Sequence, residues 1–118
     1  MGLFVARVRF PGEPPANEEI LAELARRIGS VRALEPIERR GDELRIATLL
    51  DPVAYPYLLK LLSEHGGVLL HYATSEPSTL VLPDYVDTPW VELGLGRRLA
   101  IRARFFFGLT ATARRRAR

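Results

Sequence analysis

The chain has 118 residues and a mass of 13.3 kDa, which favours a single domain. With 47% hydrophobic and 26% charged residues, its composition is that of a globular protein and excludes disordered, collagen-like and membrane-spanning chains. Because the sequence contains no cysteine, it also excludes disulfide scaffolds, thiol nucleophiles and cysteine-ligated zinc fingers.

The net charge of +3 is distributed unevenly along the chain. Residues 1–96 hold 9 basic and all 14 acidic side chains, whereas residues 97–118 hold 8 arginines and no acidic residue. The sequence therefore predicts an acidic body with a net charge of −5 and a cationic C-terminal arm with a charge of +8. Only one of the 17 basic residues is a lysine, and Asn, Gln, Cys and Met are scarce, which is typical of thermophilic proteins.

The first residues do not predict a targeting segment. Met1 to Arg7 lacks the basic start, long apolar run and small-residue cleavage site of a secretory signal. No stretch approaches the length of uncharged sequence that a transmembrane helix needs. We therefore expect a cytoplasmic protein.

A half-buried strand followed by a helix is predicted at the N-terminus. Alternate residues from Leu3 to Phe10 are apolar, so one face of this strand is suited to a core. The segment Pro11-Gly12-Glu13-Pro14-Pro15 ends the strand. A helix is then expected to begin at an Asn17 N-cap and to end at Gly29, with a pair between Glu23 and Arg27 one turn apart.

A hairpin follows this helix in the prediction. Val31 to Arg39 and Glu43 to Leu50 are two strand candidates separated by a very short connection. In Arg40-Gly41-Asp42, glycine permits the positive φ that a tight hairpin needs.

The next segment predicts a second helix and a fourth strand. Asp51 and Pro52 are suited to a helix N-cap and first position. Pro56 removes a backbone donor, so the helix is expected to be kinked or to begin nearer Tyr55. Val68 to Ala73 is apolar on both faces, which favours a strand covered on both sides.

These elements predict an α+β fold, a ferredoxin-like βαββαβ sandwich formed by residues 1–75. Right-handed crossovers place both helices on one face of the antiparallel sheet and leave the other face to solvent or a partner. The residues expected on that open face are Leu3, Val5, Arg7, Arg9, Arg45 and Ala47.

Residues 76–118 are predicted to form a C-terminal arm of one or two extra strands and an Arg-rich tail, packed on the core or on a neighbouring subunit. Prolines separate the short apolar pieces Leu80-Val81-Leu82 and Trp90-Val91-Glu92-Leu93, which are typical of edge strands or of an extended arm. Gly94-Leu95-Gly96 is expected to be a turn, because no third glycine completes a dinucleotide-binding motif. After it, apolar and basic residues alternate through Phe107, which favours a last strand.

The sequence predicts neither a catalytic site nor a metal site nor a cofactor. His65 and His71, together with Asp84 or Asp87, are the only imidazole-based candidates, and no metal-binding spacing connects them. No serine lies in a nucleophile-elbow motif. We therefore expect a protein that is not an enzyme.

Three interpretations of the arm remain open, one of which is a contact of its apolar and basic residues with an anionic membrane surface. The arginines and phenylalanines of the arm combine phosphate-binding charge with stacking surfaces, as nucleic-acid binding requires. The same residues are also suited to a contact with the acidic surface of a neighbouring subunit or another protein. The residues concerned are Arg98, Arg102, Arg104, Phe105, Phe106, Phe107, Arg114, Arg115 and Arg116.

Residues 3–73 resemble the small ligand-binding regulatory modules of the ACT and NIL families. The similarity is strongest in Val8-Arg9-Phe10-Pro11-Gly12-Glu13 and in the helical segment Ile20 to Arg27. In those families the loop after the first strand lies at ligand or subunit interfaces, so the resemblance implies ligand-binding roles for Gly12, Glu13 and Asn17. Pro14-Pro15 lengthens this loop, and residues 74–118 have no counterpart.

The expected function is that of a non-catalytic binding or regulatory module, with an unidentified ligand, that acts as a homo-oligomer and most simply as a dimer. A nucleic-acid-binding protein that uses the Arg-rich arm is the alternative.

Overall fold

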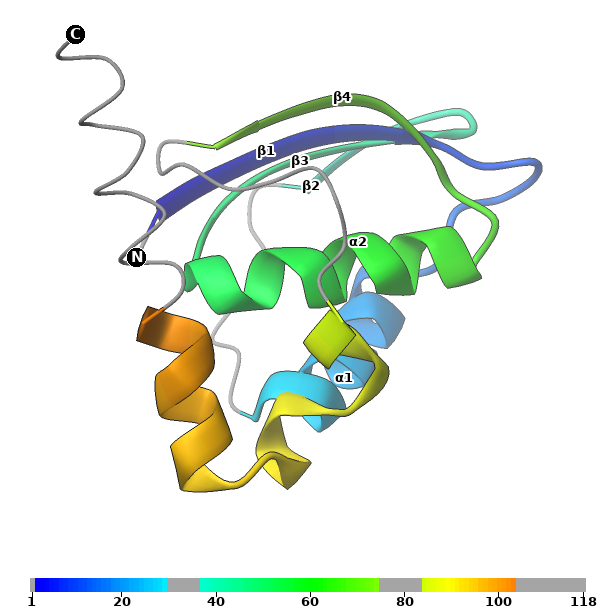
Figure 1. Ribbon diagram of the computed structural model, residues 1–118. Helices are drawn as coiled ribbons and strands as arrows, with labels where there is room; N and C mark the ends of the chain where they lie inside the picture. The colour runs from blue at the N-terminus through cyan, green and yellow to red at the C-terminus, as the bar shows by residue number, and fades with distance from the viewer. Residues whose placement is uncertain (1, 30–36, 75–83, 104–118) are drawn as a thin grey trace, which may run out of the picture.

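The computed structural model describes residues 2–29, 37–74 and 84–103 (Figure 1). The protein is an α+β structure in which strands and helices follow in the predicted order. The elements are β1 (Gly2–Arg9), α1 (Asn17–Ile28), β2 (Ile37–Arg40), β3 (Glu43–Leu50), α2 (Tyr55–Glu64) and β4 (Val68–Thr74).

The four strands form one antiparallel sheet in the order β2-β3-β1-β4. Figure 1 shows α1 and α2 on the same side of this sheet. Phe4, Ala6 and Val8 of β1 are buried on that side, and the residues between them are more exposed. The alternation predicted for the first strand is therefore confirmed.

The start of α1 differs from the prediction. Ala16 occupies the N-cap position, and no side chain caps the helix. The Asn17 side chain instead accepts a hydrogen bond from Arg39 Nη2 at 2.8 Å. Because Arg39 also donates to the carbonyl oxygens of Pro14 and Pro15, it ties β2 to the loop before α1. The helix ends at Gly29, as expected, with a positive φ of 94°.

The predicted pair between Glu23 and Arg27 is not formed. Arg27 Nη2 donates to Glu64 Oε2 at 2.6 Å, and Glu23 Oε2 lies 3.1 Å from His65 Nε2. Both contacts join α1 to the end of α2, so the packing of the two helices replaces the pairing within one helix.

The hairpin between β2 and β3 is confirmed. Gly41 has a φ of 62° in the two-residue connection, a conformation that glycine adopts without steric cost. Val31 to Pro36, the first part of the predicted strand, lies outside the described residues.

The start of the second helical segment follows the prediction for Pro56. Asp51 Oδ1 accepts a hydrogen bond from the backbone N–H of Val53 at 3.2 Å and caps a short 3-10 turn, η1 (Pro52–Ala54). The α-helix then begins at Tyr55, so Pro56 falls in its first turn, where no backbone donor is lost.

The prediction that the fourth strand is covered on both sides is wrong. β4 is an edge strand, and Val68, Leu69 and Leu70 are all exposed. The register with β1 shifts between Arg7 and Val8, so β4 carries an irregularity beside them. An edge strand has a neighbour on one side only, and its apolar residues are therefore less covered than their composition predicts.

The described part of the C-terminal extension contains no strand, and the predicted strands over Trp90–Leu93 and from Leu99 onward are wrong there. Residues 84–103 form the 3-10 turns η2 (Asp84–Asp87) and η3 (Trp90–Glu92) and a helix over 95–103. Gly94 accepts from the backbone N–H of Arg98 at 3.0 Å, so this segment begins a helix and not a turn into a strand.

This extension packs on the two helices, on the side remote from the sheet (Figure 1). Its apolar side chains belong to the same buried cluster as the sheet and helix residues; they are Tyr85, Val86, Trp90, Leu93 and Ile101. Tyr57 of α2 donates a hydrogen bond to the carbonyl oxygen of Thr88 at 2.7 Å, and burial raises the pKa of Tyr57 to about 12. Within the described part of the chain, no helix is both long and apolar enough to cross a bilayer.

Candidate functional site

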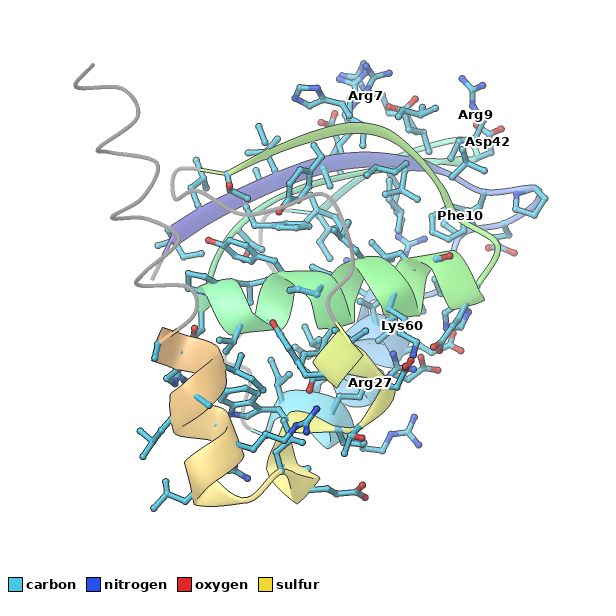
Figure 2. All side chains as sticks on the ribbon, in the orientation of Figure 1. Arg7, Arg9, Phe10, Arg27, Asp42 and Lys60 are labelled. Carbon is cyan, nitrogen blue, oxygen red and sulfur yellow. The ribbon has the colours of Figure 1, made fainter. Side chains whose placement is uncertain are left out.

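The face of the sheet opposite α1 and α2 is the surface that the sequence pattern singled out and the fold leaves without helices. On β1 it presents Leu3, Val5, Arg7 and Arg9. The strand register places Leu49, Ala47, Arg45 and Glu43 of β3 directly beside them, in that order. Figure 2 shows Arg7 and Arg9 projecting from the sheet on the side away from α2. We call this surface the open face, and its predicted residues are confirmed.

One end of the open face is charged. Arg7 Nε donates to Glu43 Oε1 at 2.6 Å, and Arg45 Nε lies 3.4 Å from the same oxygen. The hydrogen bond from Arg7 holds the pKa of Glu43 below its usual range. Beside them, Arg40 donates to Glu38 at 3.0 Å along β2. Charges of both signs therefore lie together there and partly neutralise each other.

The other end of the open face is apolar. Leu49 is 62% exposed and Leu3 is 41% exposed, and the register sets Val5 between Ala47 and Ala73. The exposed large apolar side chains at this end of the face are therefore Leu3 and Leu49. The exposed Val68 and Leu69 of β4 instead pair with Arg9 and Val8, toward the charged end of the sheet.

The loop that the sequence singled out for ligand binding lies at the surface, between β1 and α1. Gly12 and Glu13 are exposed, and an added Cβ at Gly12 would meet nothing within 4 Å. The Asn17 side chain accepts a hydrogen bond from Arg39 Nη2. Gly12 and Glu13 lie in this surface loop, whereas Asn17 is the first residue of α1 and has a structural contact that the sequence did not predict.

Two of the three described arginines of the arm, Arg98 and Arg102, bind their own chain. Arg98 donates to the carbonyl oxygens of Trp90 and Val91 at 3.0 and 2.9 Å. Arg102 forms two hydrogen bonds to the Asp51 carboxylate, at 2.9 and 3.3 Å. Both guanidinium groups lie over the Trp90 ring, at 5.9 and 5.3 Å from its centre. The sequence predicted that arginines of the arm pair with an acidic residue of a neighbouring subunit. Arg102 instead pairs with Asp51 of its own chain.

The remaining candidates of the arm lie outside the described residues. They are Arg104, Phe105, Phe106, Phe107, Arg114, Arg115 and Arg116, together with the strand predicted at Leu80-Val81-Leu82.

The two histidines are not brought together. His65 is the C-cap of α2, on the helix side, whereas His71 of β4 lies beside Arg7 in the register. Asp87, one of the suggested carboxylates, pairs with Lys60 at 2.6 Å. The described residues therefore do not assemble the imidazole pair that the sequence raised.

Sequence reasoning missed Glu43 as the residue that joins Arg7 and Arg45. Glu43 and Arg45 are two residues apart on a strand, so their side chains share a face, which is a detectable signal. That Arg7 of β1 reaches Glu43 of β3 depends on the register between the two strands, which the sequence alone does not give.

Comparison of the chain with known protein families, with curated proteins and with solved structures returns no match. The functional argument therefore depends on the residues and their arrangement.

Proposed function

We propose that this protein is a non-catalytic binding module that acts as a homodimer, in which a second copy covers the open face. The observation that carries the proposal is the apolar end of that face, where Leu49 is 62% exposed while its neighbour Leu50 is buried. A domain this small gains stability by burying such a surface.

The charges on the open face support a second copy as the occupant. Arg7, Arg45 and Glu43 carry both signs within one ion-pair group, and Glu38 pairs with Arg40 beside it. A surface with charges of both signs is compatible with itself under a two-fold axis, because each cation can meet an anion of the partner. A polyanion such as nucleic acid would have to compete with these carboxylates.

The fold supports the same class of function. Strand order β2-β3-β1-β4 with both helices on one side is what a ferredoxin-like sandwich requires, and we propose that fold for residues 1–75. From the resemblance to the ACT and NIL modules, we propose that a regulatory ligand binds near Gly12, Glu13 and Asn17. The nucleic-acid alternative has less support, because Arg98 and Arg102 are held by contacts within the chain.

The test is sedimentation velocity at micromolar protein concentration. Leu49→Arg introduces a cation at the apolar end of the proposed interface, on a side chain that is exposed in the protomer. Leu95→Arg is the matched control, because Leu95 is 72% exposed on the helix over 95–103, on the opposite side of the molecule. We expect the wild type and Leu95→Arg to sediment as dimers and Leu49→Arg to sediment as a monomer.

Two results would contradict this proposal. If the wild type sediments as a monomer, the protein is not a dimer. If Leu49→Arg is still a dimer but Leu95→Arg is a monomer, the interface lies on the C-terminal extension and not on the open face. Tight, strongly salt-dependent binding of a labelled oligonucleotide by a monomeric wild type would favour the nucleic-acid alternative.

A further inference from the structure

Three potential metal ligands meet on the helix side of the molecule, remote from the open face. Glu19 and Glu23 lie one helical turn apart on α1, so their side chains share one face of the helix. His65, the C-cap of α2, faces them. Each of the three side chains offers one ligand atom, and these atoms all lie within 4.8 Å of one another.

One of the distances in the cluster is close to that between two ligands of a coordinated ion. His65 Nε2 and Glu23 Oε2 are 3.1 Å apart. Ligand atoms about 2.0–2.2 Å from a zinc ion in tetrahedral geometry are separated by roughly 3.3 Å. Glu19 is exposed and Glu23 and His65 are partly buried, so the outer ligand retains the rotamer freedom needed to close the remaining distance.

The ligand set also indicates the class of metal. A site made of carboxylates alone would be suited to Mg²⁺ or Ca²⁺, whereas one imidazole nitrogen with two carboxylate oxygens favours Zn²⁺ and similar transition metals. Three protein ligands leave a fourth position for water or another ligand.

The electrostatic surroundings favour a cation. The C-terminal end of α2 carries the negative end of its helix dipole, and no basic residue lies in its last turn. Of the two arginines in the last turn of α1, Arg26 and Arg27, Arg27 is held by Glu64 at 2.6 Å. The two glutamates would compensate both charges of a divalent ion.

We propose that Glu19, Glu23 and His65 form a binding site for a divalent transition-metal ion such as Zn²⁺, which links α1 to the end of α2. The site is independent of the proposed dimer, because it lies on the other side of the sheet. Its structural effect is to fix the end of α2 from which the chain enters β4.

The experiment measures Zn²⁺ binding to chelator-treated full-length protein by isothermal titration calorimetry, and the unfolding midpoint with and without ZnCl₂. We expect one Zn²⁺ per chain in the wild type and a higher unfolding midpoint with the metal present. His65→Asn and Glu23→Gln should each weaken binding at least tenfold and remove the shift of the midpoint. Glu19→Gln changes an exposed side chain, so this variant should fold like the wild type, and it should also weaken Zn²⁺ binding.

Two matched controls separate this site from adventitious binding. Glu18→Gln removes the adjacent exposed carboxylate that lies outside the cluster, and His71→Asn removes the other imidazole. Both variants should bind Zn²⁺ like the wild type. The proposal is overturned if the wild type does not bind Zn²⁺, if the Glu19→Gln and His65→Asn variants bind it unchanged, or if His71→Asn abolishes binding.

Discussion

Both faces of the sheet carry apolar residues, but they have opposite surroundings. The charged residues of β1 and β3 all lie on the open face; they are Arg7, Arg9, Glu43 and Arg45. On β1, Phe4 is 0% exposed and its neighbour Leu3 is 41% exposed. The same contrast separates Leu50 from Leu49 on β3. Because successive residues of a strand point to opposite faces, the difference arises from the helices that cover one face and not from the residues themselves. An apolar residue therefore predicts burial only where the fold supplies a cover.

The largest expected effect tests the covered face. Phe4 packs against the rings of Tyr55 and Tyr72, with ring centres 5.3 and 5.6 Å away. We expect Phe4→Ala to lower the free energy of unfolding by about 3–5 kcal/mol, because it leaves a cavity in the core. Urea denaturation measures this change.

The open-face counterpart of that substitution is Leu49→Ala. At protein concentrations that favour the monomer, we expect a change within about 0.5 kcal/mol, as for other exposed sites. A similar loss of stability in Phe4→Ala and Leu49→Ala would show that the two faces of the sheet do not differ in burial.

A smaller effect is expected at Gly67, where the chain enters β4 on the covered side. A Cβ there would lie 2.6 Å from Val8 Cγ1 and 2.7 Å from the carbonyl oxygen of Leu62. We expect Gly67→Ala to destabilise the protein by about 1–3 kcal/mol through overpacking. Gly12→Ala is the matched control, since its Cβ meets nothing within 4 Å. Equal thermal midpoints for the two variants would show that this close approach does not exist.

A smaller destabilisation than at Gly67 is expected at Tyr57, which connects the helices to the extension. Tyr57→Phe removes the hydrogen bond to the Thr88 carbonyl, and we expect a loss of about 1 kcal/mol at neutral pH. Burial raises the pKa of Tyr57 from 10.0 to about 12, so between these values the folded protein retains a proton that the unfolded chain releases. The stabilisation is thus complete below pH 10 and is lost as the pH rises through 12.

Denaturation of the wild type and Tyr57→Phe across this alkaline range provides the measurement. The difference between their unfolding free energies should shrink toward pH 12. A difference that stays constant from neutral pH upward would mean that the Tyr57 hydroxyl is not buried.

The sequence predicted the order of the body elements and the residues of the open face. These predictions depend on local signals: the alternation along β1, the glycine in the β2–β3 turn and the prolines before α2. It failed at Asn17, because Arg39 provides a partner from a distant strand. It also failed over 95–103, where alternating apolar and basic residues favour a strand but form a helix that buries Ile101 and places Arg98 and Arg102 over Trp90.

The candidate sites divide in the same way. The pattern of Leu3, Val5, Arg7 and Arg9 was visible in the sequence, because side-chain direction follows from strand geometry alone. The grouping of Glu19 and Glu23 with His65 was not visible, because it joins residues more than forty positions apart.

By itself, the sequence determined which residues share a face, because backbone geometry fixes that periodicity locally. Only the tertiary structure decided which face is covered, which ion pairs form and that the first part of the arm folds back as a helix. Those outcomes depend on contacts between distant segments, whose energies compete with local preference and can override it.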